Sequence, residues 1–258
     1  MPLPTYAGGE VAMERRRFVR KLVALAIPGG LLGVLLKKST AKAAEYDATK
    51  HYYGMGIQID KCIGCGRCVE ACKDENGVPK DPFYFRTWVE RYTIKQNGEV
   101  IVRNIDPRLE GVRENVGEGD ILRSFFVPKL CNQCDNPPCV QVCPVGATFK
   151  TEDGVVLVDE NRCIGCRYCI QACPYGARYL NPKTETADKC TFCYHRITKG
   201  LLPACVEVCP TQARIFGEMR SSASPLTRFK RMNKLHVLKP SLNTEPKVMY
   251  SNLDGEVR

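Results

Sequence analysis

Cysteine content constrains this chain more than any other feature of its sequence. Sixteen of its 258 residues are cysteines, and they fall into four groups of four, so that no cysteine stands outside a group. So many thiols in one folded chain are explained by disulfide bonds or by metal binding. The groups are Cys62-x2-Cys65-x2-Cys68-x3-Cys72, Cys131-x2-Cys134-x4-Cys139-x3-Cys143, Cys163-x2-Cys166-x2-Cys169-x3-Cys173 and Cys190-x2-Cys193-x11-Cys205-x3-Cys209.

The groups also share residues around their cysteines, which indicates repeated units. Asp60-Lys61-Cys62-Ile63-Gly64-Cys65 in the first group resembles Asn161-Arg162-Cys163-Ile164-Gly165-Cys166 in the third. The second, third and fourth groups close with Cys-Pro-x-x-Ala, which begins at Cys143, Cys173 and Cys209, whereas the first group lacks the proline.

The spacing within the groups favours iron–sulfur clusters over the other uses of cysteine. A [4Fe-4S] cube needs four converging thiolates, and three close cysteines wrap it from one loop, in which Gly64 and Gly165 permit a tight backbone. In bacterial two-cluster ferredoxins the fourth cysteine ligates the other cluster. Structural zinc uses two separated pairs, for which a third close cysteine is superfluous. A disulfide framework does not explain the repeated Cys-Pro exits, and redox-active pairs account for few thiols. The fourth group is the weakest on its own, because eleven residues interrupt it.

Residues 1–43 have the three-part order of an export signal. Arg15-Arg16-Arg17-Phe18-Val19-Arg20 precedes an apolar run from Leu22 to Leu36, and Ala41-Lys42-Ala43 gives a small-x-small cleavage pattern. Paired arginines are typical of the twin-arginine route, whose receptor carries folded cargo. The apolar run of 15 residues is about 22 Å long as a helix, which is short for a bilayer core. We therefore expect a twin-arginine signal peptide; an N-terminal amphipathic anchor is the alternative.

Most of the excess positive charge lies in this N-terminal segment. The formal net charge is +10, and residues 1–43 hold eight basic and two acidic residues, so that +4 remains for the rest of the sequence. Each oxidised, thiolate-bound cube carries about −2, which gives roughly −4 for a protein loaded with four cubes. We therefore expect no nucleic-acid partner.

Local patterns predict short strands between the cysteine groups. Met55, Ile57 and Ile59 alternate with other residues, which predicts a strand over 53–60 leading into the first group. Asn97-Gly98 predicts a β-hairpin. The remaining expectations are hairpin arms over 88–94 and 100–104, a strand over 125–130, a second hairpin over 147–159 around Asp153-Gly154, a loop over 105–122, and an extended tail over 221–258 that is basic at Arg228, Lys230, Arg231 and Lys234.

Four cubane motifs in this order resemble the iron–sulfur subunit of the dimethyl-sulfoxide-reductase family of complexes. That family includes the electron-transfer subunits of nitrite, polysulfide and tetrathionate reductases. The resemblance covers about residues 53–220 and extends to Thr244-Glu245-Pro246-Lys247-Val248-x-Tyr250. It implies an α+β fold of two interleaved ferredoxin-like two-cluster modules with an inserted β-hairpin and an extended C-terminal tail. The implied divisions are 1–43 (signal peptide), 53–80 with 186–220 (first module), 81–120 (insertion with the hairpin), 121–185 (second module) and 221–258 (tail).

The resemblance also implies how the cysteines share four clusters, because the fourth cysteine of each group ligates a cluster of the partner group. No cysteine is replaced, so we expect four [4Fe-4S] clusters with all sixteen cysteines as iron ligands. The implied sets are Cys62, Cys65, Cys68 and Cys209 (cluster 1); Cys72, Cys190, Cys193 and Cys205 (cluster 2); Cys131, Cys134, Cys139 and Cys173 (cluster 3); and Cys143, Cys163, Cys166 and Cys169 (cluster 4).

The resemblance implies an electron-transfer subunit of an oxidoreductase complex, without a catalytic site of its own. Its partners would be a quinone-reactive integral membrane subunit and a molybdopterin-type catalytic subunit or a multihaem cytochrome c, besides the twin-arginine export machinery. The expected location is the periplasm, with peripheral attachment to the outer face of the inner membrane. The alternatives are a free periplasmic polyferredoxin, a hydrogenase-linked subunit and, in another class, a disulfide-stapled secreted structural protein.

The other polar and aromatic residues give no catalytic pattern. No paired carboxylates or nucleophile–base pairs stand out, and His51, His195 and His236 are scattered. A hydrogen-bonded structural role is expected for His195. Core packing is expected for the aromatic cluster between the first two groups, with a partner interface as the alternative. This cluster consists of Phe83, Tyr84, Phe85, Trp88 and Tyr92.

Overall fold

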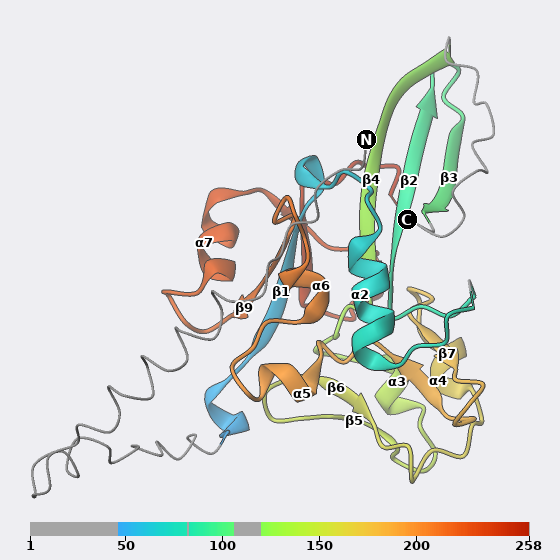
Figure 1. Ribbon diagram of the computed structural model, residues 1–258, viewed down its shortest axis with the longest axis vertical. Coiled ribbons are helices and arrows are strands. Elements are labelled where there is room, and N and C mark those ends of the chain that lie inside the picture. Colours follow the sequence, from blue (N-terminus) through green and yellow to red (C-terminus); the bar gives the residue numbers. More distant parts are fainter. Residues whose placement is uncertain (1–45, 82, 106–119, 258) are drawn as a thin grey trace, which may run out of the picture. The chain divides into compact units, whose positions relative to one another are not determined.

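The structure, a computed structural model, describes residues 46–81, 83–105 and 120–257 (Figure 1). The predicted signal peptide and most of the predicted loop over 105–122 lie outside these residues. The described part combines short helices with four small sheets. Its α-helices are α2 (Arg67–Asn76), α3 (Pro138–Gln141), α4 (Tyr168–Gln171), α5 (Tyr194–Ile197), α6 (Ala204–Glu207) and α7 (Pro225–Met232); its 3-10 helices are η1 (Ala48–Lys50), η2 (Ile59–Lys61) and η4 (Pro240–Leu242).

The largest sheet draws its strands from both ends of the described residues. Its order is β10-β11-β1-β9, in which β1 pairs in parallel with β11 and antiparallel with β9. The strands are β1 (Tyr53–Gln58), β9 (Arg214–Glu218), β10 (Leu235–His236) and β11 (Val248–Ser251). The predicted strand over 53–60 is thus confirmed except that its last residues turn into η2.

A second sheet, with the order β3-β2-β4, lies between the first two cysteine groups in sequence. It consists of β2 (Thr87–Lys95), β3 (Val100–Ile105) and β4 (Ile121–Leu130). Asn97 and Gly98 stand at the turn between β2 and β3, where Glu99 N–H bonds to the Asn97 side chain and Gly98 has φ +84°. β4 runs directly into Cys131 and so positions the second cysteine group.

Two two-stranded sheets accompany the second and third cysteine groups. β5 (Thr148–Lys150) pairs antiparallel with β6 (Val156–Val158), and β7 (Arg178–Leu180) pairs with β8 (Ala187–Lys189). α3 packs against α4, and each helix packs against the strand that follows its group. Figure 1 shows these short elements together, away from the upper end of β2, β3 and β4.

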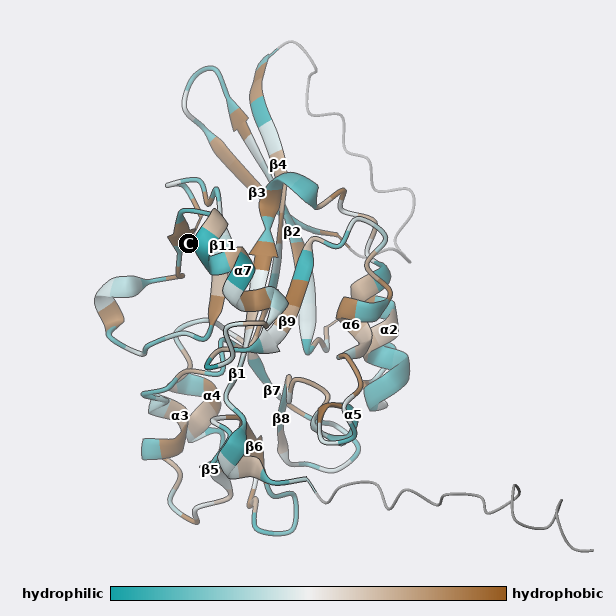
Figure 2. Ribbon diagram, turned by 90° about the vertical axis from the view of Figure 1, so that its left-hand side faces the viewer, coloured by the Kyte–Doolittle hydropathy of each residue, from teal (hydrophilic) through white to brown (hydrophobic). Residues whose placement is uncertain are grey.

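The prediction of an extended tail over 221–258 is wrong. Ser224 caps α7 by accepting a hydrogen bond from the Leu226 N–H at 3.3 Å, and Pro225 occupies the first turn. Leu226 and Phe229 are buried, and the helix packs on β9 and β1 (Figures 1 and 2). The four residues of β11 are all buried. A helix of eight residues and a buried strand of four are too short to give a clear periodicity, and the sequence therefore predicted an extended tail.

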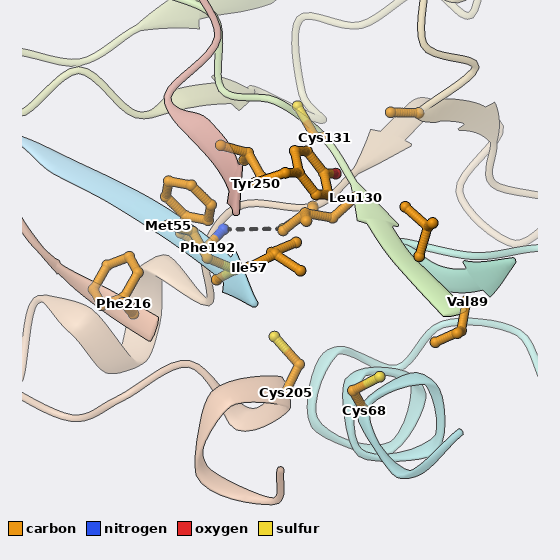
Figure 3. Close-up of a cluster of buried hydrophobic side chains, with 14 of the residues drawn as sticks. Met55, Ile57, Cys68, Val89, Leu130, Cys131, Phe192, Cys205, Phe216 and Tyr250 are labelled. Carbon is orange, nitrogen blue, oxygen red and sulfur yellow. Dashed lines mark hydrogen bonds between the residues drawn. The ribbon is translucent and has the colours of Figure 1, made fainter. Parts of the chain in front are cut away.

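The main apolar core lies among β1, β4, β9 and β11. Met55, Ile57, Val127 and Tyr250 are fully buried there, together with Phe192 from the fourth cysteine group. Figure 3 shows Cys68 and Cys205 on one side of this core and Cys131, at the end of β4, on the other. The core therefore separates Cys131 of the second group from Cys68 and Cys205 of the first and fourth groups.

Candidate iron–sulfur sites

Cysteines of the first and fourth groups share one cavity. Cys62 and Cys65 come from the loop after η2, Cys68 from the first turn of α2, and Cys209 from the residues after α6; all four line about 330 Å³ of space free of protein atoms. α2 and α6 pack against each other, which brings Cys209 to the first group. The set predicted for cluster 1 thus surrounds one space.

A second cavity joins the same two groups, but here the first group supplies one cysteine and the fourth group supplies three. Cys72, one turn after Cys68 on α2, lines about 280 Å³ of space together with Cys190, Cys193 and Cys205. The Asn76 side-chain amide lies 3.6 Å from the sulfurs of both Cys72 and Cys193. One amide group therefore contacts two thiols that come from groups far apart in the sequence.

A third cavity joins the second and third groups. Cys131, Cys134, Cys139 and Cys173 line about 320 Å³ of space. Cys131 follows β4, Cys139 lies on the short helix α3, and Cys173 follows α4. Each of the three cavities is thus lined by one of the predicted sets of four cysteines.

The fourth predicted set consists of Cys143, Cys163, Cys166 and Cys169. The Thr148 N–H points at the Cys143 sulfur and the Ala187 N–H at the Cys163 sulfur, each at 3.4 Å. Cys163 and Cys169 belong to a small apolar cluster that also contains Cys139 of the neighbouring set. The set itself stays a prediction.

The surroundings of the thiols are consistent with iron ligation. All sixteen cysteines lie in the described residues, and none forms a disulfide. Burial raises the pKa of Cys205 to about 11 and that of Cys134 to about 12. Buried thiolates need positive charge nearby, which iron supplies. No three His, Cys, Asp or Glu side chains of the described residues converge as ligands of a single metal ion; the cysteines instead stand around cavities.

The Ile-Gly pairs of the first and third groups shape equivalent loops. Gly64 and Gly165 both have φ +67°, which glycine adopts without strain. A Cβ atom would lie 2.4 Å from the Phe126 ring at Gly64 and 2.6 Å from the Glu185 carbonyl oxygen at Gly165. Both the backbone conformation and the neighbours therefore require glycine, as the spacing predicts.

Two buried arginines beside the cysteines were missed by the sequence analysis. Arg214 lies 3.4 Å from the Cys68 sulfur, and Arg178 lies 3.0 Å from the Cys139 sulfur. Both side chains are buried, and each arginine directly follows the alanine of a Cys-Pro-x-x-Ala segment. An arginine at the same position in two of these segments was the signal in the sequence that could have revealed them.

Comparison with known proteins identifies the family. Models described as "4Fe-4S dicluster domain" match residues 61–147 and 122–219, so that together they cover all four cysteine groups. The sequence is 40% identical to a tetrathionate reductase subunit of Salmonella typhimurium over 252 residues, which cover 96% of this chain and 92% of the relative. This protein belongs to the iron–sulfur subunits of the dimethyl-sulfoxide-reductase family.

Two further relatives support this membership. A tetrathionate reductase subunit of Archaeoglobus fulgidus is 49% identical over 225 residues, covering 87% of this chain and 94% of the relative. A polysulfide reductase polypeptide of Wolinella succinogenes is 38% identical over 197 residues, covering 76% of this chain and 92% of the relative. As a subunit of this family the chain is an electron-transfer protein with two dicluster domains, and its sixteen cysteines fit four [4Fe-4S] clusters.

Exposure distinguishes two cysteines of this iron–sulfur subunit from the other fourteen. Cys65 and Cys166 are exposed, whereas every other cysteine is buried or half-buried. Beside them, Ile63 is 58% and Ile164 is 66% exposed, which is unusual for isoleucine. The two loops lie in the first and third groups, and hence in the predicted clusters 1 and 4.

The remaining predicted residues divide between core and surface. His195 is hydrogen-bonded, because its Nε2 lies 2.7 Å from Glu75 Oε1, as expected for a structural role. Tyr92 is buried in the core, but Phe83 is 81% exposed, so that core packing is wrong for Phe83. Of the described helices, of which the ten-residue α2 is the longest, none has the length and hydropathy of a membrane span.

Proposed function

We propose that the chain relays single electrons along four [4Fe-4S] clusters between a quinone-reactive integral membrane subunit and a periplasmic partner. The partner is a molybdopterin-type catalytic subunit or a multihaem cytochrome c. This proposal depends on one observation, which is that only Cys65 and Cys166 among the sixteen cysteines are exposed. A relay needs two open ends and a shielded middle, and these two cysteines belong to the first and last of the proposed clusters.

The proposed ligand sets cross between groups. Clusters 1 and 2 use the first and fourth groups, and clusters 3 and 4 use the second and third. This divides the chain into two interleaved modules, 53–80 with 186–220 and 121–185, with the hairpin region 81–120 inserted between them. The support is that three of the four sets line one cavity each.

The chain's own residues hold, shield and tune the sites. When bound, a [4Fe-4S] cube accepts and releases one electron at a time. Backbone N–H groups of Phe192, Thr148 and Ala187 point at cysteine sulfurs at 3.4 Å, and such hydrogen bonds favour the more negative, reduced state. The apolar core around the buried cysteines excludes water from the middle of the row.

Cysteine replacements test the crossed sets. Cys209→Ala and Cys65→Ala should each remove the same electron paramagnetic resonance signal from the reduced protein, because both residues belong to cluster 1. Cys205→Ala, four residues from Cys209 in the sequence, should remove a different signal. Each variant should lose about one quarter of roughly 16 irons per chain. Loss of one common signal in the Cys205 and Cys209 variants would contradict the crossed sets.

Purification from membranes tests the partners. The tagged chain should retain a membrane subunit and a catalytic or haem subunit in high salt, and a quinol analogue should reduce its clusters in that complex. A chain that carries four clusters but retains no neighbour would instead be the free polyferredoxin, and recovery of a hydrogenase would identify the hydrogenase-linked alternative.

We also propose that the chain acts in the periplasm, at the outer face of the inner membrane, after export of the loaded protein. The support is the order of basic, apolar and small residues within 1–43. Replacing Arg15 and Arg16 by lysine should leave a cluster-containing precursor in the cytoplasm. Normal export of this variant would contradict the proposed route.

A further inference from the structure

A buried cation lies between each pair of neighbouring ligand sets. This inference rests on the ligand sets proposed above. Four clusters in a row leave three gaps, which lie between clusters 1 and 2, between clusters 2 and 3, and between clusters 3 and 4. Arg214, Lys189 and Arg178 lie at these gaps, and their exposed fractions are 2%, 1% and 5%. In the part of the chain that the structure describes, no carboxylate forms an ion pair with any of the three.

Arg214 contacts the first two sets directly. Its Nη2 lies 3.4 Å from the Cys68 sulfur of cluster 1, and its Nη1 lies 3.8 Å from the Cys205 sulfur of cluster 2. Nη2 also donates to the Thr87 hydroxyl at 2.7 Å, which fixes the guanidinium plane. One guanidinium group therefore faces a ligand of each set.

Arg178 occupies the matching place between the third and fourth sets. Its Nη2 lies 3.0 Å from the Cys139 sulfur of cluster 3, and its Nη1 donates to the Thr148 hydroxyl at 3.3 Å. The Thr148 backbone N–H points in turn at the Cys143 sulfur of cluster 4. The Nε of Arg178 is buried without a hydrogen-bond partner among the described residues, so protein groups satisfy this cation incompletely.

Lys189 joins the two central sets. Its ammonium group donates to the carbonyl oxygens of Cys190, at 2.9 Å, and of Val156. Cys190 belongs to cluster 2, and its carbonyl also accepts from Gln133 Nε2 at 2.6 Å. Gln133 lies between two ligands of cluster 3, Cys131 and Cys134, so that Lys189 and Gln133 lie where the loops of both sets meet.

Electrostatics explains why three such cations persist in the interior. A buried charge without a counter-ion is strongly unfavourable. Thiolate-bound cubes carry negative charge, which grows by one unit on reduction, and two neighbouring cubes repel each other. We propose that Arg214, Lys189 and Arg178 are counter-ions of the three gaps, and that each raises the reduction potentials of the two clusters beside it.

The test uses the loaded, full chain with one cation neutralised at a time. Arg214→Gln, Lys189→Met and Arg178→Gln are compared with the unmutated protein by redox titration followed by electron paramagnetic resonance. In each variant, reduction of the two adjoining clusters should become at least tenfold less favourable, or about 59 mV more negative for a one-electron couple. Arg123→Gln is the control, because Arg123 is half exposed and pairs with Asp254.

The pattern of shifts separates a counter-ion from a packing role. Clusters 2 and 3 should each respond to two of the variants, whereas clusters 1 and 4 should each respond to one. The cysteine replacements described above assign each signal to its set. Unchanged potentials, equal shifts of all four clusters, or an equal effect of Arg123→Gln would overturn the proposal.

Where a neutral variant loses its iron, variants that keep the positive charge test the counter-ion role instead. Arg214→Lys, Arg178→Lys and Lys189→Arg should load four clusters and keep the adjoining potentials within a threefold change of the reduction equilibrium. A tenfold shift in these variants would overturn the counter-ion role. Fewer than four clusters in the unmutated protein would instead refute the proposed ligand sets and function, so that the two failures are distinguishable.

Discussion

The outer cysteine groups, which are the first and the fourth, rest on a larger scaffold than the inner groups, the second and the third. The outer groups are held by the ten-residue helix α2 and by a four-stranded sheet, besides the four-residue helices α5 and α6 of the fourth group. The inner groups are held by the four-residue helices α3 and α4 and by two-stranded sheets, and the second group also follows directly on the long strand β4. Yet both regions place one arginine beside the third cysteine of a group. Similar cysteine geometry therefore does not require equal scaffolds, and we expect a bound cluster to contribute more to the stability of the inner region, whose sheets are smaller.

The largest expected effect concerns the scaffold of the outer groups. Tyr250, in β11, is fully buried, and its replacement by alanine should lower the free energy of unfolding by about 3–5 kcal/mol, as for other large aromatic residues in cores. Its hydroxyl has no partner among the described residues, so Tyr250→Phe should change the stability by less than about 1 kcal/mol. Urea unfolding without oxygen measures both; equal losses would mean that the hydroxyl, rather than the ring, stabilises the sheet.

Removal of iron should destabilise the inner region more than the outer region. In the apo-protein, amides of β5, β6, β7 and β8 should exchange with solvent at least about 100-fold faster than in the loaded protein, because short elements need the bound cluster. Amides of β1, β9 and β11 should change less than about tenfold, because the sheet and its apolar core remain. Hydrogen exchange read by mass spectrometry measures this, and uniform acceleration would contradict the comparison.

Lys247 links the two regions and should give a dependence of stability on pH. Its carbonyl accepts from the Met55 N–H of β1 at 3.0 Å, and its ammonium group donates to the Gly154 carbonyl beside the inner groups. Burial lowers the pKa of Lys247 from 10.5 to about 8. Between these values the unfolded state holds a proton that the folded state releases, so stability should rise with pH, by at most about 1.4 kcal/mol per unit.

Urea midpoints between pH 7.5 and 10.5 check this prediction. Lys247→Met should remove the rise in stability that Lys247 contributes. Lys239→Met, which also removes a lysine bonded to a backbone carbonyl but an exposed one, should retain it. Identical pH profiles for the unmutated protein and Lys247→Met would show that Lys247 is not the responsible group.

The smallest expected effect compares equivalent backbone positions. Gly66 of the first group and Arg167 of the third both follow the exposed cysteine, and both are left-handed, with φ of 70° and 67°. Gly66→Ala should destabilise the outer region by about 1 kcal/mol, and Arg167→Gly should stabilise the inner region by a similar amount. The urea midpoints should move in opposite directions; a shift in the same direction would mean that these loops are not equivalent.

The cysteine pattern predicted more of the sites than of the fold. Spacing alone indicated clusters, because close triplets such as Cys62, Cys65 and Cys68 suit one loop around a cube. The crossing of Cys209 to the first group came only from the family resemblance, since sequence spacing carries no information on which distant segments pack together.

The residues that tune the sites were harder to predict. Arg178 and Arg214 occupy the same place in two repeats, but a charged residue is ordinarily exposed, and only the structure shows them buried. The C-terminal strand β11 was not predicted, for another reason. Val248, Met249 and Tyr250 form a short apolar run without alternation, and such a run is read equally well as a loop, a strand or part of a helix.

The place of β11 in the sheet has a consequence for biosynthesis. Val248–Ser251 pairs directly with β1, where Met55 lies opposite Val248, although it leaves the ribosome after all sixteen cysteines. Until this segment has been made, the sheet that carries the first and fourth cysteine groups lacks one of its inner strands.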